Sequence, residues 1–220
     1  MSLHRFTRYS GSTGGVPVTG PQLEPAAAAP DFRGRRLLYV VTGGVQAMFL
    51  PSWLTWLRAG YPDLQVRHIL TRAATRFVTP TIAAVAAGGT PGLLDEWPDQ
   101  PSSALHVELA QWPDTILVHP ATMHFMGRLA LGLADTPALL ALQCTMAPIV
   151  VCPSLPPHGH LNPAYRRHVL ELSARDNITV LPPTYGTSIS TGETGIGTPA
   201  QLTDALHALE QLRQWGDNTP

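Results

Sequence analysis

The sequence predicts an α/β fold in which helices cover both faces of a parallel sheet. Short β-branched apolar runs alternate along the chain with longer segments whose apolar residues repeat at helical spacing. Turns of small residues follow three of the predicted strands, at residues 42–45, 71–74 and 120–124. Because the carboxyl ends of parallel strands lie at one edge of a sheet, we expect these turns to converge on a ligand.

The predicted elements follow one another from residue 35 onward. Strands are expected at residues 37–41, 66–70, 115–118, 149–152 and 178–181. Helices are expected at residues 45–59, 74–87, 165–174 and 201–215, and another after the turn at 120–124. A long loop is expected after Gly88-Gly89. If residues 104–109 are extended, His106 and Glu108 lie on one face.

Composition predicts one soluble, cytoplasmic domain. The chain has 220 residues, a net charge of -1 and 13% charged residues, so no basic field attracts nucleic acid or a membrane surface. Neither an export signal nor a membrane span is expected. A hydrophobic content of 44% favours subunit contacts. Cys144 and Cys152 lie in or beside apolar runs and are expected to be buried thiols.

Two segments differ in composition from the rest. Residues 1–34 are rich in Gly, Ser, Pro and Ala and predict a disordered tail, which leaves residues 35–220 as the folded domain. Residues 184–198 are polar and glycine-rich, and we expect either a disordered connector or a clamp that closes over a substrate.

The turn at residues 120–124 is the main candidate for a ligand site. Its small residues let backbone N–H groups approach an anion or a planar cofactor, and Thr122 is placed to cap the next helix and to bond the ligand. An ordinary strand-to-helix turn with a threonine cap explains the local pattern equally well. The turn at Thr42-Gly43-Gly44 does not match G-x-G-x-x-G, so a dinucleotide site is not supported.

Residues 106–122 read H-x-E-L-x-x-W-x-D-x-x-x-x-x-P-A-T, and residues 132–135 read G-L-A-D. The order of these motifs resembles that of the homo-oligomeric flavin-containing cysteine decarboxylases. The turn T-G-G-V resembles the family's first flavin turn, T-G-S-I-A, and T-R-A-A-T-R-F at residues 71–77 resembles its second. The segment P-S-L-P-P-H-G-H-L-N-P at residues 153–163 falls where the family has P-x-M-N-x-x-M-W-x-N-P. The likeness covers residues 35–215 in unbroken order.

This resemblance implies a flavodoxin-like, Rossmann-like flavoprotein domain over residues 35–220. It implies FMN rather than FAD, and trimers or dodecamers with the flavin at a subunit interface. The family's catalytic histidine corresponds to His106. Its flavin contacts correspond to Gly43, Gly44, Val45, Thr71, Phe77, Ala121, Thr122, Met123 and Asp135.

Three positions depart from the family pattern. Its asparagines are replaced by His124, Leu131 and Pro156. The asparagine at the position of Pro156 binds the substrate carboxylate in the family, and proline has no amide to replace it. His124, His158, His160 or the N–H groups of residues 184–198 are the alternatives, and the same segment supplies Tyr185 to hold a peptide.

The chemistry favours a decarboxylase. Loss of CO2 from cysteine needs an electron sink, and oxidation of the CH2–SH group to a thioaldehyde by a flavin provides one. A histidine such as His106 suits deprotonation of the thiol. Phosphopantothenoylcysteine decarboxylases use a cysteine in the C-terminal loop to reduce the enethiol, whereas residues 184–198 contain none. The resemblance therefore favours the peptidyl-cysteine decarboxylases of aminovinyl-cysteine peptide biosynthesis, which act on a precursor peptide ending in cysteine.

Other functions remain open at the level of sequence. These are a phosphopantothenoylcysteine decarboxylase-like enzyme, a flavin prenyltransferase-like enzyme and a non-catalytic flavin-binding partner subunit. The prenyltransferase needs basic residues for a prenyl phosphate, and only Arg72, Arg76 and Arg128 lie near the turns. No metal is expected, since His158 and His160 lack a third ligand with suitable spacing.

Overall fold

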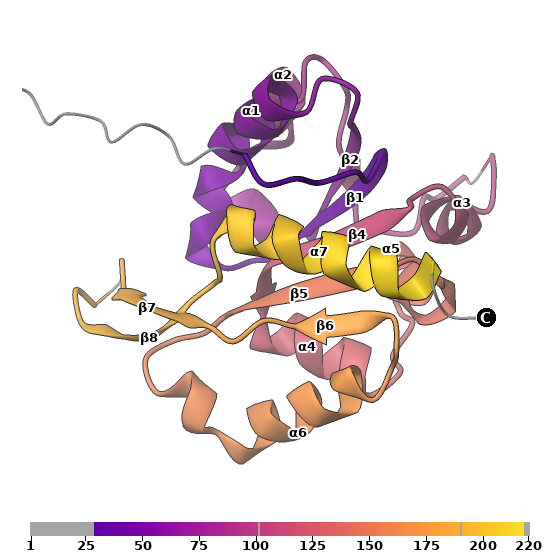
Figure 1. Cartoon of the computed structure of the whole chain (residues 1–220). Helices are drawn as coiled ribbons and strands as arrows, with labels where there is room; N and C mark the ends of the chain where they lie inside the picture. Colours follow the sequence, from indigo (N-terminus) through magenta and orange to yellow (C-terminus); the bar gives the residue numbers. More distant parts are fainter. Residues whose placement is uncertain (1–28, 101, 190, 218–220) are drawn as a thin grey trace, which may run out of the picture.

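A six-stranded parallel sheet forms the centre of the structure (Figure 1). This computed structural model describes residues 29–100, 102–189 and 191–217. The strand order is β3-β2-β1-β4-β5-β6. The strands are β1 (Arg36–Val41), β2 (Gln65–Leu70), β3 (Leu93–Leu94), β4 (Thr115–Thr122), β5 (Ile149–Ser154) and β6 (Ile178–Val180). Because β1 leads to β2 on one side and pairs with β4 on the other, the switch point of the sheet lies between β1 and β4.

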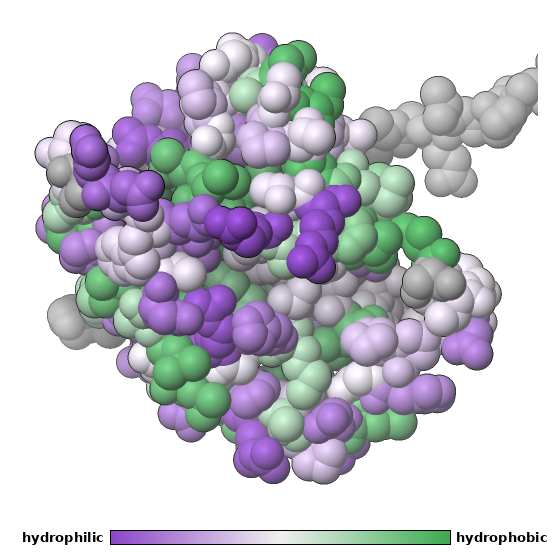
Figure 2. Space-filling view, turned by 180° about the vertical axis from the view of Figure 1, so that it is seen from behind, coloured by the Kyte–Doolittle hydropathy of each residue, from purple (hydrophilic) through white to green (hydrophobic). Residues whose placement is uncertain are grey.

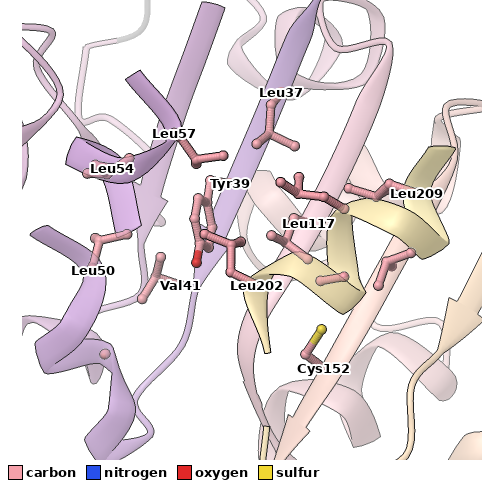
Figure 3. Packing of buried hydrophobic residues seen from close by; sticks show 14 of the residues in the cluster. Leu37, Tyr39, Val41, Leu50, Leu54, Leu57, Leu117, Cys152, Leu202 and Leu209 are labelled. Atoms are coloured by element: carbon pink, nitrogen blue, oxygen red, sulfur yellow. The ribbon is translucent and has the colours of Figure 1, made fainter. Parts of the chain in front are cut away.

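One face of the sheet packs against α1 (Leu50–Gly60), α2 (Pro80–Ala86) and α7 (Leu202–Asp217). Successive β1 side chains alternate between the faces, and Leu37, Tyr39 and Val41 point to this one. Figure 3 shows them against Leu50, Leu54 and Leu57 of α1 and Leu202 and Leu209 of α7. Each of these three residues is completely buried, as are Leu38 and Val40 on the opposite face. Strand β1 is therefore covered on both faces.

The other face packs against α3 (Leu105–Gln111), α4 (Met123–Ala130), α5 (Pro137–Cys144) and α6 (Pro163–Ser173). Leu38 and Val40 of β1 point into this layer. The fold is therefore the flavodoxin-like, doubly wound sheet that the sequence predicts. None of the helices within the described residues is both long and apolar enough to cross a bilayer.

Polar caps set where several helices begin. The hydroxyls of Thr79, Thr122 and Thr136 accept hydrogen bonds from the N–H groups three residues later, and the Asn162 carboxamide caps α6. Proline takes the first position of α2, α5 and α6, where its missing N–H costs nothing. The predicted helix at residues 74–87 is accordingly two pieces, a 3-10 turn η2 (Ala74–Arg76) and then α2.

Three other elements differ from the sequence prediction. Residues 104–109 belong mostly to helix α3 and are not extended, because Leu105 and Leu109, one turn apart, both pack against the second core layer. Helix α5 and the short strand β3 were not predicted. Residues 184–198 form a hairpin of β7 (Thr184–Thr187) and β8 (Thr194–Thr198). The predicted helix at residues 45–59 starts as a 3-10 turn, η1 (Val45–Phe49).

The N-terminal segment packs against the domain before residue 35. Phe32 is buried and contacts Tyr61 edge to face, with ring centroids 5.9 Å apart. The Arg33 N–H donates to the Glu210 carboxylate of α7 at 2.9 Å. Although burial opposes it, this bond and those from Arg213 and Gln214 lower the pKa of Glu210 to about 2. The tail predicted over residues 1–34 thus reaches the packed domain by Phe32, and its residues 1–28 lie outside the described ones.

The two cysteines differ in exposure. Cys152 is buried on β5, and burial raises the pKa of its thiol. Cys144 is exposed, so the expectation of two buried thiols is wrong for this residue. It is the last residue of α5, after the buried Ala141 and Leu142 have already filled the core-facing side of that turn.

His119 joins β4 to the segment that enters α7. Its Nε2 lies 2.9 Å from the Ala200 carbonyl oxygen, and its Nδ1 lies 2.9 Å from the Tyr39 hydroxyl. A carbonyl only accepts, so Nε2 carries the proton and the Tyr39 hydroxyl donates to Nδ1. Trp53 packs edge to face on the imidazole at 4.3 Å. The ring is buried, and this burial lowers the pKa of His119 to about 4.

Acid should therefore destabilise the protein through His119. The unfolded chain takes up this proton below pH 6.5 and the folded chain only near pH 4, so the free energy of unfolding falls across that window. The full loss from this group is about 3 kcal/mol. Urea unfolding between pH 7 and pH 4 measures it. His119→Gln keeps a donor and an acceptor without titrating, and a pH profile as steep as the wild type's would contradict this role.

Candidate active site

Two cavities lie at the carboxyl ends of β1 and β4. The first, of about 380 Å³, is enclosed by four segments. They are the turn at Gly43, Gly44, Val45 and Gln46, the start of α4, residues 154–157 after β5, and the hairpin of β7 and β8. A second cavity of about 300 Å³ shares Gly43, Thr122 and His124 with the first. The predicted turns therefore do converge at the switch point of the sheet.

Thr42 holds the two turns at the switch point together. Its hydroxyl donates to the Pro120 carbonyl at 2.8 Å and accepts from the Thr122 N–H at 2.8 Å. Its own N–H donates to the same Pro120 carbonyl at 3.2 Å. Thr42 is only 1% exposed, so these bonds are shielded from water. The start of α4 is thereby placed directly beside the glycine turn.

Glycine is required at the turn because neighbouring segments approach closely. A Cβ atom on Gly43 would lie 2.4 Å from the Ala73 Cβ, in the turn after β2. On Gly44 it would lie 2.9 Å from the Ser154 hydroxyl oxygen. The absence of both side chains lets three strand ends meet around one space.

Backbone donors lie at the start of α4, whose first residues line the first cavity. The Thr122 hydroxyl caps the helix by accepting from the Phe125 N–H at 3.3 Å. The N–H groups of Met123 and His124 belong to the first helical turn and have no acceptor within the helix. Both residues line the first cavity. Such a helix start favours a negatively polarised oxygen of a ligand.

Charged side chains near the second cavity are paired with one another. Arg72 bonds Glu96 at 2.6 Å, and Arg128 bonds the exposed Asp135 at 2.5 Å, which lowers the pKa of that carboxyl. Asp95 is 4% exposed and accepts from the Ala138 N–H at 2.9 Å. Burial raises the pKa of Asp95. The first cavity has fewer charges, since His124 and Glu193 are the ionisable side chains among the residues that line it.

The residues matched to flavin contacts fall into two groups. Gly43, Gly44, Val45, Thr122 and Met123 line the first cavity, and Thr71 lines the second. The other three lie outside both linings. Ala121 is buried beneath the turn, Phe77 is 41% exposed, and Asp135 is exposed beside Arg128.

His106 is not part of either cavity within one chain. It lies on α3, where it lines a separate surface pocket with Val107, Ala110, Cys144 and Met146. Its ring packs edge to face on Trp97 at 5.7 Å. The Nδ1 atom is buried and finds no hydrogen-bond partner among the described residues. One copy of the chain therefore does not bring this histidine to the turns that were matched to flavin contacts.

The residues expected to bind the substrate do not all line the same cavity. His124 and Pro156 line the first cavity, whereas His158, His160 and Tyr185 do not. His158 has a left-handed backbone with φ 65°, and Tyr185 is 72% exposed on β7. The hairpin still forms one wall, through residues such as Gly186, Ser188 and Ile196. Its base is attached to the sheet, because the Leu155 N–H donates to the Gly197 carbonyl at 2.9 Å.

Two polar residues of the cavity were missed from sequence. Gln46 and Ser154 both line it, and the Ser154 hydroxyl donates to the Gln46 Oε1 at 2.7 Å. Gln46 directly follows T-G-G-V, so its position after a strand-end turn was an available signal. Asp95 was missed because it follows a strand of only two residues.

Comparison with known proteins identifies relatives across most of the chain. A cypemycin cysteine dehydrogenase (decarboxylating) from Streptomyces sp. is 34% identical over 190 residues, which cover 84% of this chain and 95% of that protein. The crystal structure of the cypemycin decarboxylase CypD matches with a TM-score of 0.69 and 32% identity, covering 86% of this chain and 98% of that one.

More distant matches are longer proteins. The coenzyme A biosynthesis bifunctional protein CoaBC of Escherichia coli (strain K12) is 30% identical over 180 residues, which cover 80% of this chain but 42% of CoaBC.

The close approach of Gly43 to Ala73 predicts how a methyl group at residue 43 changes the stability of the protein. Gly43→Ala should destabilise the protein by about 1–3 kcal/mol, because the new Cβ overlaps Ala73 and forces the two turns apart. Urea unfolding measures the change. Gly195→Ala is the control, since its Cβ meets nothing within 4 Å. Equal stabilities of the two variants would show that the turns are not tightly packed.

The family model described as Flavoprotein matches residues 26–214, and together with these relatives it shows that the chain belongs to the flavoprotein family.

Proposed function

We propose that this protein catalyses the FMN-dependent oxidative decarboxylation of the C-terminal cysteine of a ribosomally made precursor peptide. The product is an enethiol that serves aminovinyl-cysteine ring formation. The observation that carries the proposal is the cavity at the switch point, where the turns matched to flavin contacts meet a glycine-rich hairpin. The 34% identical cypemycin cysteine dehydrogenase (decarboxylating) supports the same reaction class.

The residues of the two adjoining cavities fit a flavin. Gly43 and Gly44 leave backbone exposed where side chains would block it, and the first N–H groups of α4 suit polarised oxygens. Gly43, Gly44, Val45, Thr122 and Met123 would hold the cofactor from the first cavity, and Thr71 from the second. When bound, FMN supplies a two-electron acceptor that takes a hydride from the substrate CH2–SH carbon.

His106 is proposed to take the proton of the substrate thiol. With the hydride removed from carbon and the proton from sulfur, the cysteine side chain becomes a thioaldehyde. The C–C bond to the carboxylate then breaks, CO2 leaves, and the electron pair is delocalised into the enethiolate. A histidine exchanges protons near neutral pH and is therefore suited to this step.

The position of His106 supports a shared active site. This residue lies outside the two cavities of its own chain, in a surface pocket whose lining also includes Val107 (39% exposed) and Met146 (86% exposed). Apolar patches interrupt the polar surface on the face turned away from α7 (Figure 2). We propose that the chain forms a homo-oligomer, a trimer or a dodecamer, in which a neighbouring subunit inserts His106 beside the flavin.

The hairpin is proposed to hold the peptide. Tyr185, Ile189 and Ile196 expose 72%, 54% and 39% of their surfaces there, and the strand edges offer backbone groups for pairing with an extended peptide. Residues 184–198 contain no cysteine to reduce the product further, so release as an enethiol is expected.

A phosphopantothenoylcysteine decarboxylase-like activity is the second candidate. It is favoured by the 30% identity to CoaBC, a protein of coenzyme A biosynthesis. The two functions use the same oxidation and decarboxylation and differ in the group attached to the cysteine. Parallel assays with a cysteine-terminated peptide and with phosphopantothenoylcysteine distinguish them.

The purified protein should be yellow and should convert a peptide that ends in cysteine. Anaerobic addition of the peptide should bleach the flavin absorption and give a product lighter by CO2 and two hydrogens. His106→Asn should keep the flavin and slow turnover by roughly 10²–10⁴-fold. His207→Asn, on the exposed side of α7, should keep both the flavin and the wild-type turnover. Flavin bands that persist with an intact peptide would reject the proposed activity.

Co-expression of two defective variants tests the shared site. His106→Asn leaves the cavity intact, and Gly43→Ala leaves His106 intact. If His106 acts across an interface, mixed oligomers should regain activity at roughly a quarter of their sites. No recovery, in oligomers shown by mass spectrometry to be mixed, would place the proton transfer within one chain.

A further inference from the structure

We propose that the Gln46 carboxamide, oriented by Ser154, binds the substrate carboxylate that is lost as CO2. This inference rests on the proposed function and names the residue that recognises the reacting group. Gln46 lies outside the motif segments matched to the family, and Ser154 occupies a variable position of the segment at residues 153–163.

The hydrogen bond between the two residues determines which way the amide faces. The Ser154 hydroxyl donates to the Gln46 Oε1 at 2.7 Å, so the carbonyl side of the amide is occupied. A carboxamide is planar, and its NH2 group therefore points away from Ser154 with two donors. Within the described residues, no acceptor bonds this NH2 group. Both residues line the first cavity.

The first cavity offers few charged side chains that could bind a carboxylate. No arginine lines the first cavity, and the printed sequence contains no lysine at all. Glu193 repels a carboxylate, and Pro156 at the same wall has no side-chain donor. His124 lies between the two cavities and is exposed. Gln46 thus offers an oriented pair of donors without a charge.

A neutral amide also suits the reaction. The carboxylate charge disappears when CO2 forms, so a group that binds it strongly stabilises the starting state more than the transition state. Hydrogen bonds to an ionised partner are strongest when both groups are charged. An amide can orient the carboxylate without the larger ground-state stabilisation that an arginine would add.

The absence of a side chain at Gly44 leaves space beside Gln46 and Ser154. A Cβ at this residue would lie 2.9 Å from the Ser154 hydroxyl oxygen and 3.4 Å from the Pro120 Cβ. The space between the turn of β1 and the end of β5 therefore exists only for the backbone of glycine. This close approach brings Gln46 and Ser154, which are 108 residues apart, into contact.

The experiment compares two unreactive peptides on the flavin-loaded enzyme. One ends in serine and keeps the carboxylate, and the other ends in ethanolamine and lacks it. Inhibition constants against a cysteine-terminated substrate measure their binding. The wild type should prefer the serine peptide by roughly tenfold to a hundredfold, the range for hydrogen bonds to a charged group.

Gln46→Glu should remove this preference and raise the KM of the substrate. It should leave the flavin content and the inhibition constant of the ethanolamine peptide unchanged. Ser154→Ala should weaken the preference partly, because the amide is no longer held. Gln201→Glu adds the same charge at an exposed residue outside the cavity and should behave as the wild type.

Three results separate the possibilities. A Gln46→Glu enzyme that still prefers the serine peptide overturns the inference while leaving the proposed function standing. Loss of flavin from this variant would make Gln46 a cofactor ligand and would also overturn it. A wild type that releases no CO2 rejects the proposed function itself.

Discussion

The hydrogen bonds of Thr42 are the constraint on which the site depends. Pairing between β4 and β5 shifts register between Val118 and Ala121, where the regular ladder is interrupted. On the other side of β4, the regular pairing with β1 ends at Val40 and Val118, and the Thr42 side chain then bonds Pro120 and Thr122. A buried side chain thus positions the glycine turn and the start of α4 relative to each other, and the space between them is the cavity.

The elements that could be predicted from the sequence are those whose apolar residues form a clear pattern. Strands β1, β4 and β5 are buried on both faces and have short apolar runs in their sequences, whereas β2 and β6 are buried over part of their lengths. Residues 104–109 alternate polar and apolar side chains over too few positions to separate a strand from a helix, and tertiary packing of Leu109 decides for the helix. Residues 184–198 predict a disordered connector or a clamp and no strands, because their glycines and threonines carry no hydrophobic alternation.

The candidate site was predictable where topology alone determines it. Parallel strands bring their following turns to one edge, so Gly43, Thr71 and Thr122 were expected together and lie around adjoining cavities. His106 lies elsewhere, because a motif specifies order along one chain and not the placement of a second copy. Gln46 follows the matched T-G-G-V where the resembling motif T-G-S-I-A has alanine, so likeness to a family gave it no role.

Among the described residues, the hairpin is hydrogen-bonded to the domain near its base. Leu155 bonds Gly197 at the end of β8, and Ala200, three residues later, bonds His119. The turn that connects β7 to β8 lies beyond both attachments. Mutations there can accumulate without disturbing the sheet or the buried imidazole, whereas changes near Gly197 cannot. Evolution can therefore adapt the outer wall of the cavity to new ligands while the sheet edge beneath it stays the same.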